Sequence, residues 1–297
     1  MSQQMVSQKA RVSANKIELH RLGAWSGACL ALIAFVAIAT SSGSAANMAY
    51  ATVALNGYNQ FGTLDLTTGV FTSLNNAEPN YLTLAAVGGT LYATGEAYGS
   101  TAEGKLYTVN TANGNLTLVG AMTNVGVNGV EVFGSTTGGL FALSDTLTSN
   151  SVNPATGAGT LLGPSGAPGF ANWYALSGSG SALYAGVQTN FYTVNTTTGA
   201  YTLVGSFGTP IVGYGLAQMG AMTFVNGVLY GAQEGSWIDT INTTTGVATG
   251  GPMLAGGYIY GLAPDVPTNP APEPGSLALL GSGALAAAGI LRRKLLP

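Results

Sequence analysis

The sequence of 297 residues contains very few charged residues. Only 8 Lys and Arg and 11 Asp and Glu are present, so 6% of the chain is charged, against about 25% in an ordinary soluble domain. The hydrophobic share of 46% excludes a disordered tail. Ser, Thr, Asn and Gly must therefore solvate most of the surface.

The few charges are unevenly distributed. Residues 47–271, the body of the chain, contain one basic residue, Lys105, and nine carboxylates, which gives the body a net charge of −8. The carboxylates are Asp65, Glu78, Glu96, Glu103, Glu131, Asp145, Glu234, Asp239 and Asp265. Nucleic-acid binding draws most of its affinity from Lys and Arg on phosphates, so the sequence excludes it for this region.

Cysteine and histidine are nearly absent. Cys29 and His20 are the only ones, and both precede residue 47. A body without them can form no disulfide, thiol nucleophile, Zn site with Cys or His ligands, or Ser-His-Asp triad. Its oxygen donors suit Ca²⁺ best, but no Ca²⁺-binding motif is present, so we predict no cofactor and no metal.

Residues 1–46 have the pattern of an export signal. A basic, polar segment precedes the apolar run Trp25 to Thr40, and Ser44-Ala45-Ala46 supplies small residues for cleavage after Ala46. The alternative is an uncleaved N-terminal anchor, although the apolar run is shorter than the roughly 20 residues of a span. Both interpretations predict that the body is exported.

The C-terminal segment 272–297 has three parts. Pro272-Glu273-Pro274 is followed by the apolar stretch Gly275 to Leu291 and then by Arg292-Arg293-Lys294. Seventeen helical residues reach about 25 Å, the lower limit for crossing a bilayer, and the basic cluster favours the cytoplasmic side. We predict a transmembrane helix here, joined to the body by a Pro-rich linker at 264–271.

This tripartite segment resembles the PEP-CTERM sorting signal of exported Gram-negative proteins. The resemblance implies recognition by an exosortase, a membrane cysteine protease, with transient anchoring in the inner membrane before release to the cell surface or outside. It also implies an association with extracellular polysaccharide and biofilm. A plain C-terminal membrane anchor is the alternative interpretation.

The body contains an internal repeat of about 44 residues. Five turn motifs place Asn or Asp four residues before Gly, with successive glycines 45, 43, 42 and 47 residues apart. The motifs are Asp65 to Gly69, Asn110 to Gly114, Asn153 to Gly157, Asn195 to Gly199 and Asn242 to Gly246. This period lies in the range of β-propeller blades.

Each turn motif is flanked by runs of β-branched and aromatic residues, which predict a β-hairpin. A Leu-Tyr-Ala-like element and a further apolar run precede each hairpin, so we predict four strands in each of five units over 47–263. The run 258–263 can pair with 50–53 and close a ring. The pattern loosely resembles bacterial propellers of the Kelch, quinoprotein and WD40 sort. An irregular β-sandwich or β-solenoid remains the alternative fold.

Candidate site residues fall into two groups. Glu96, Glu103, Glu131 and Glu234 are of the type that a carboxylate-dependent glycosidase needs, but they form no motif, so we predict no catalytic residue. Trp173 and Trp237 are candidate ligand contacts because an aromatic ring can stack on a sugar. The repeated tyrosines Tyr92, Tyr184 and Tyr230 are instead expected to pack between units.

The sequence thus predicts an exported, surface-sorted β-propeller without catalytic activity, with a structural or glycan- or protein-binding role in the extracellular matrix. One alternative is a glycan hydrolase or lyase on the same scaffold. Another is a membrane-tethered periplasmic binding or assembly protein. A pair of carboxylates about 5 to 10 Å apart in a cleft would favour the enzyme.

Overall fold

A computed structural model describes residues 47–76, 81–95, 104–123, 125, 130–144, 147–167, 174–208, 218–233 and 236–265. Every regular element in these ranges is a β-strand. No helix among the described residues is long and apolar enough to cross a membrane. The predicted signal segment and the predicted C-terminal helix lie outside the described residues, and so do most of the linker and the sorting motif.

In the described ranges, twenty strands form five antiparallel sheets of four strands each, here called blades 1 to 5. From the axis outward, blade 1 contains β20 (Gly257–Pro264), β1 (Met48–Leu55), β2 (Tyr58–Asp65) and β3 (Phe71–Asn76). Blade 2 contains β4 (Tyr81–Val87), β5 (Thr90–Gly95), β6 (Lys105–Val109) and β7 (Leu116–Ala121). Blade 3 contains β8 (Val130–Thr136), β9 (Gly139–Ser144), β10 (Thr148–Val152) and β11 (Gly159–Pro164). Blade 4 contains β12 (Tyr174–Ser179), β13 (Ala182–Val187), β14 (Asn190–Val194) and β15 (Tyr201–Ser206). Blade 5 contains β16 (Met219–Val225), β17 (Val228–Gln233), β18 (Trp237–Ile241) and β19 (Ala248–Thr249).

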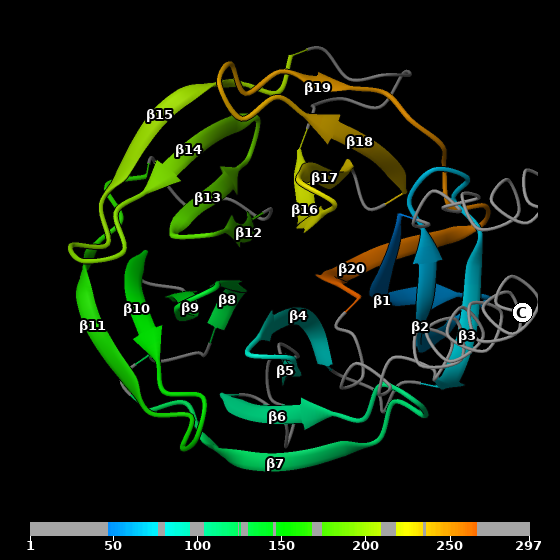
Figure 1. The fold of residues 1–297 in the computed structure, drawn as a ribbon, viewed down its shortest axis with the longest axis horizontal. Coiled ribbons are helices and arrows are strands. Elements are labelled where there is room, and N and C mark those ends of the chain that lie inside the picture. The colour runs from blue at the N-terminus through cyan, green and yellow to red at the C-terminus, as the bar shows by residue number, and fades with distance from the viewer. Residues whose placement is uncertain are drawn as a thin grey trace, which may run out of the picture. The chain divides into compact units, whose positions relative to one another are not determined.

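The blades are arranged around a common axis, as in a β-propeller (Figure 1). The inner strands β20, β4, β8, β12 and β16 follow one another around that axis, and each contacts the next. The predicted five-unit propeller is therefore confirmed, and the sandwich and solenoid alternatives are wrong.

The ring closes by pairing the two ends of the body. Strand β20 pairs antiparallel with β1 along its length, from Leu55 opposite Gly257 to Ala49 opposite Pro264. Blade 1 thus takes its inner strand from the C-terminal end and its other three strands from the N-terminal end. This confirms the predicted pairing of 258–263 with 50–53.

The five turn motifs explain why the hairpins form where they do. In each turn the side-chain oxygen of the Asn or Asp accepts a hydrogen bond from the backbone N–H two residues on, at 2.8 or 2.9 Å. The backbone N–H of the Gly donates to the carbonyl oxygen of that same Asn or Asp at 2.7 or 2.8 Å. All five glycines have φ between +72° and +79°, a region that side chains with a Cβ rarely adopt. Local chemistry alone fixes these turns.

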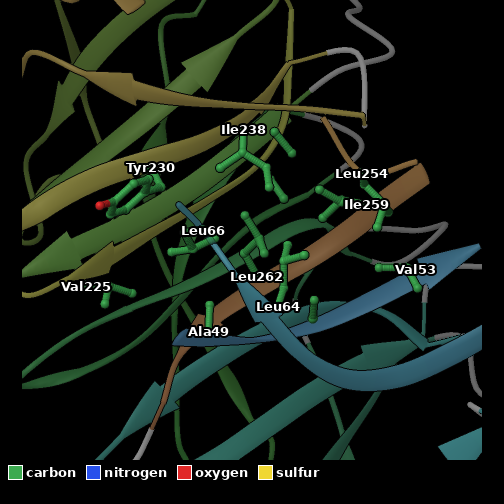
Figure 2. Close-up of a cluster of buried hydrophobic side chains, with 13 residues drawn as sticks. Ala49, Val53, Leu64, Leu66, Val225, Tyr230, Ile238, Leu254, Ile259 and Leu262 are labelled. Carbon is green, nitrogen blue, oxygen red and sulfur yellow. The ribbon is translucent and has the colours of Figure 1, made fainter. Parts of the chain in front are cut away.

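The hydrophobic core lies between neighbouring blades. In the cluster of Figure 2, Val53 and Leu64 of blade 1 meet Tyr230 and Ile238 of blade 5, and Ile259 from the closing strand packs among them. Four similar clusters occupy other blade interfaces among the described residues. Tyr92 and Tyr230 are buried in these clusters and Tyr184 packs against one, so the tyrosines pack between blades as predicted.

Backbone hydrogen bonds also join neighbouring blades near the rim. The N–H of Gly159 donates to the carbonyl oxygen of Thr123 at 2.9 Å, and the N–H of Tyr201 donates to that of Ser165 at 2.8 Å. The N–H of Ala248 donates in the same way to Phe207 at 3.0 Å. Each bond links the start of one outer strand to the segment after the preceding one, and together the bonds join blade 2 to blade 3, blade 3 to blade 4 and blade 4 to blade 5.

Candidate functional site

The described parts of the inner strands enclose a small cavity on the axis of the propeller. Residues of all five inner strands surround an axial cavity of about 10 Å³, among them Thr83, Phe133, Leu176, Met222 and Leu262. This volume is at the lower limit for holding one water molecule. The axial cavity among the described residues therefore cannot hold a sugar or a cofactor.

One row of side chains recurs on every blade. An aromatic residue of the second strand lies opposite a Thr or Ser of the third, which in turn lies opposite a Thr of the outer strand. The five rows are Tyr50-Thr63-Thr72, Tyr92-Thr108-Thr117, Phe141-Ser151-Thr160, Tyr184-Thr193-Thr202 and Tyr230-Thr240-Thr249.

Each row divides into a packed part and a solvated part. Paired residues of an antiparallel sheet lie on the same face, and the aromatic members pack against the next blade, as Tyr50 does against Leu91 and Val109. The outer threonines, among them Thr117 and Thr202, are exposed. The rows therefore place five equivalent pairs of hydroxyl groups around the outer part of the ring.

Apolar side chains accompany these hydroxyls on three outer strands. Leu118, Leu161 and Leu203 occupy the same position in β7, β11 and β15 and are 56%, 59% and 59% exposed. Only Lys105, at the start of β6, carries positive charge among the described residues. The rim thus combines hydroxyl groups with isolated apolar side chains and very little charge.

A surface groove of about 290 Å³ lies at one end of blade 2. The strand register brings Thr90, at the start of β5, beside Asn110, which follows the end of β6, because Tyr92 lies opposite Thr108. The lining residues are Gly89, Thr90, Leu91, Thr108, Val109, Asn110, Thr111 and Thr117. None of them is ionisable, so the groove is lined by hydroxyl and amide groups together with the apolar residues Leu91 and Val109.

Tyr50 of blade 1 contacts the blade 2 turn beside the groove. Burial raises the pKa of the Tyr50 phenol, a hydrogen bond with the Thr111 side chain acts in the opposite direction, and the nearby Asp265 carboxylate raises the pKa further. Tyr50 therefore stays protonated at neutral pH and links blade 1 to the turn of blade 2. This contact fixes Thr111 at the edge of the groove.

Two of the described carboxylates, those of Asp65 and Asp239, lie within blades. Asp65 serves its turn, where hydrogen bonds from Thr67 lower the pKa of its carboxyl group. Asp239 is completely buried within blade 5, and burial raises the pKa of its carboxyl group to about 6. No group of three or more His, Cys, Asp or Glu residues that could hold a metal ion occurs in the described part of the chain.

The remaining candidates from the sequence are only partly described. Trp237 begins β18 and is half-buried, opposite Gln233 and in a bridge with Met253. Trp173, Glu96, Glu103 and Glu234 lie outside the described residues, and only the backbone of Glu131 is described, in β8. The groove could not be predicted from the sequence, because Thr90, Thr108 and Thr117 belong to three different strands. The only signal in the sequence is that threonines recur beside the turn motifs.

Comparison with solved structures finds matches at low sequence identity. A structural genomics protein of unknown function from Bacteroides thetaiotaomicron is 16% identical, with a TM-score of 0.46, over 70% of this chain and 58% of that one. The extracellular domain of a protein from B. thetaiotaomicron assigned as a hybrid two-component system is 12% identical, with a TM-score of 0.37, over 65% and 25%. This chain thus spans about half and a quarter of their lengths, and neither likeness carries a functional argument.

The family comparison concerns the C-terminus alone. No curated protein matches the chain significantly. Residues 270–294 match the family model described as the PEP-CTERM protein-sorting motif, and the match spans Pro272, Glu273, Pro274 and the cluster Arg292 to Lys294. The chain therefore carries a PEP-CTERM sorting motif, which implies an exported protein that is anchored transiently by its C-terminus and processed by an exosortase.

Proposed function

We propose that the propeller, once exported and processed, is a non-catalytic interaction module of the extracellular matrix that contacts polysaccharide. The observation that carries this proposal is the set of five equivalent hydroxyl pairs on a rim with almost no charge. Hydroxyl groups donate and accept hydrogen bonds as sugar hydroxyls do. A rigid ring presents them at fixed positions without the entropy loss of ordering a flexible surface.

The propeller would bind polysaccharide through many weak hydroxyl contacts rather than one strong one. A single exposed hydroxyl contributes little net binding energy, because it exchanges a bond to water for a bond to the ligand. Several contacts on one rigid scaffold raise the overall affinity through effective concentration when the ligand is a long chain. The repeat therefore supports a structural role in a polymer network.

The enzyme alternative lacks a comparable observation. A glycosidase needs two carboxyl groups on either side of a sugar bond, whereas Asp65 caps a turn and Asp239 is buried. The axial cavity of about 10 Å³ could not admit a sugar ring. Neither of these two carboxylates is placed as a glycosidase would need it.

The test is to follow the native protein through fractionation of its host's matrix. We expect it to remain with the polysaccharide through a high-salt wash, because its contacts are uncharged, and to be released when the polysaccharide is digested. The purified protein should leave the number of reducing ends unchanged. An increase in reducing ends would establish the enzyme, and a protein found only in the periplasm or inner membrane would establish the tethered alternative.

A further inference from the structure

We propose that the groove on blade 2 is a binding site for a short stretch of an uncharged glycan. This inference rests on the proposed function and makes it specific, since it names the place on the ring where the glycan is held most tightly and one ligand class. The groove volume of about 290 Å³ lies at the lower end of the range for small-ligand sites. Because the groove is open, a chain can enter it without a free end.

The polar groups of the groove have unused hydrogen-bonding capacity. Among the described residues, the hydroxyls of Thr90 and Thr117 make no hydrogen bond, and the Thr108 hydroxyl makes only a long one, 3.5 Å to the Thr117 carbonyl oxygen. The Oδ1 of Asn110 is occupied by the N–H of Ala112 at 2.9 Å, which leaves its amide group to donate. The groove therefore offers donors and acceptors together, as a sugar requires.

The charge balance selects a neutral ligand. No lining residue is ionisable, so an anionic group that lost water in the groove would find no counter-charge, which is strongly unfavourable. The body as a whole carries nine carboxylates and one lysine between residues 47 and 271. Its field repels polyanions, so a uronic-acid-rich or sulfated chain is disfavoured.

Two local differences in sequence distinguish blade 2 from blades 4 and 5. The hairpin between β4 and β5 is Gly88-Gly89, with φ of +59° and +77°, so no side chain covers this end of the groove. The position of Thr90 is Ala182 in blade 4 and Val228 in blade 5, each at the start of the corresponding strand. Blade 2 therefore has an additional hydroxyl at an uncovered position, which the other two lack.

The repeat supplies a matched control. Thr193 and Thr202 of blade 4 pair as Thr108 and Thr117 do, with the same 3.5 Å bond from hydroxyl to carbonyl. The experiment compares the mature protein from its host with two doubly substituted forms, Thr108→Val with Thr117→Val and Thr193→Val with Thr202→Val. Melting temperatures within the error of the unsubstituted protein show that all three are folded.

The probes are the neutral and the acidic fractions of the host's extracellular polysaccharide, separated by anion exchange, and binding is measured by retardation in gels that contain each fraction. We expect the neutral fraction to retard the unsubstituted protein. The blade 2 form should bind that fraction roughly tenfold more weakly, because two hydroxyl contacts are lost. The affinity of the blade 4 form should change less than twofold. Adding Thr90→Phe, which fills the groove, should abolish retardation.

The inference would be overturned by no retardation by the neutral fraction, by binding of the acidic fraction alone, or by equal weakening by the two double substitutions. Equal binding of all forms, in a protein that remains with the matrix, would reject the groove and keep the proposed function. A protein absent from the matrix would reject the proposed function itself.

Discussion

Gly205 in β15 packs directly against the carbonyl oxygen of Thr245, which belongs to the hairpin turn of the next blade. The same relationship joins Gly120 to Thr156 and Gly163 to Thr198. Thus the glycine near the end of an outer strand receives the turn of the following blade. Because a Cβ would collide with that oxygen, this glycine serves the assembly of the ring rather than the flexibility of its own strand.

The first prediction follows from this contact. Gly205→Ala should destabilise the propeller by about 1–3 kcal/mol, since a methyl group must displace backbone from a packed interface. Thermal unfolding measures the loss. Gly139→Ala is the control, because its methyl group would meet only Phe141 at 3.8 Å or more. Equal melting temperatures for the two variants would show that the inter-blade contact is loose.

The turn motifs give a second prediction. Asn195→Ala removes the acceptor of hydrogen bonds from the backbone N–H groups of Thr197 and Thr198, at 2.9 and 3.0 Å, and should lower the free energy of unfolding by about 1–2 kcal/mol. Asn195→Asp should retain most of the stability, because Asp65 performs this role in blade 1. Urea unfolding at pH 7 compares them, and an Asp variant as weak as the Ala variant would contradict the account.

Ring closure provides a third prediction. Ile259→Ala should lower the free energy of unfolding by about 2–5 kcal/mol, because Ile259 is completely buried where the closing strand meets blade 5 (Figure 2). Leu203→Ala, at a 59% exposed position, should change it by less than about 0.5 kcal/mol. Unfolding in which blade 1 melts separately from the rest would show that closure does not make the ring cooperative.

Asp239 gives a prediction about pH. Its burial raises the pKa of the carboxyl group from 3.8 to about 6, neither carboxylate oxygen makes a well-formed hydrogen bond among the described residues, and the nearby N–H of Gly251 offsets the burial only in part. Since the folded state favours the neutral form, stability is fully present below about pH 4, falls between pH 4 and 6, and stays lower above pH 6.

Asp239→Asn should therefore remove most of this pH dependence and stabilise the protein at pH 8, by on the order of 2 kcal/mol. Asn150 occupies the same strand position in blade 3, so the fold already accepts an amide there. Urea midpoints at pH 4 and pH 8 test the prediction. A variant whose stability follows the same pH profile as the unsubstituted protein would assign the dependence to another group.

Local chemistry made much of the fold predictable from the sequence. The Asn-to-Gly spacing fixes a turn wherever it occurs, so five turns, their hairpins and the strand pairs beside them could be located, and the count of repeats gave the number of blades. The closing pair followed because the run 258–263 had no partner of its own within the repeat.

The repeated tyrosines were expected between blades, but the other contacts between repeats could not be predicted from the sequence. The docking of Gly205 on Thr245 depends on how two blades meet, and the burial of Asp239 depends on a position that is Tyr107 in blade 2 and Tyr192 in blade 4. The groove likewise needs the register of β5 against β6. Trp237 is a candidate from the sequence because it is an aromatic residue outside the repeat pattern and at a strand end, and the structure places it half-buried beside Met253.

The sorting motif at 270–294 underlies the whole functional account, and the mass of the mature protein tests it most directly. The intact mass of the protein made by its native host should correspond to a released product that begins at Asn47 and lacks Arg292 to Lys294. Substitution of Pro272 and Pro274 by Ala should prevent that release. Recovery of the unsubstituted chain from the inner membrane with Arg292 to Lys294 attached would contradict the account.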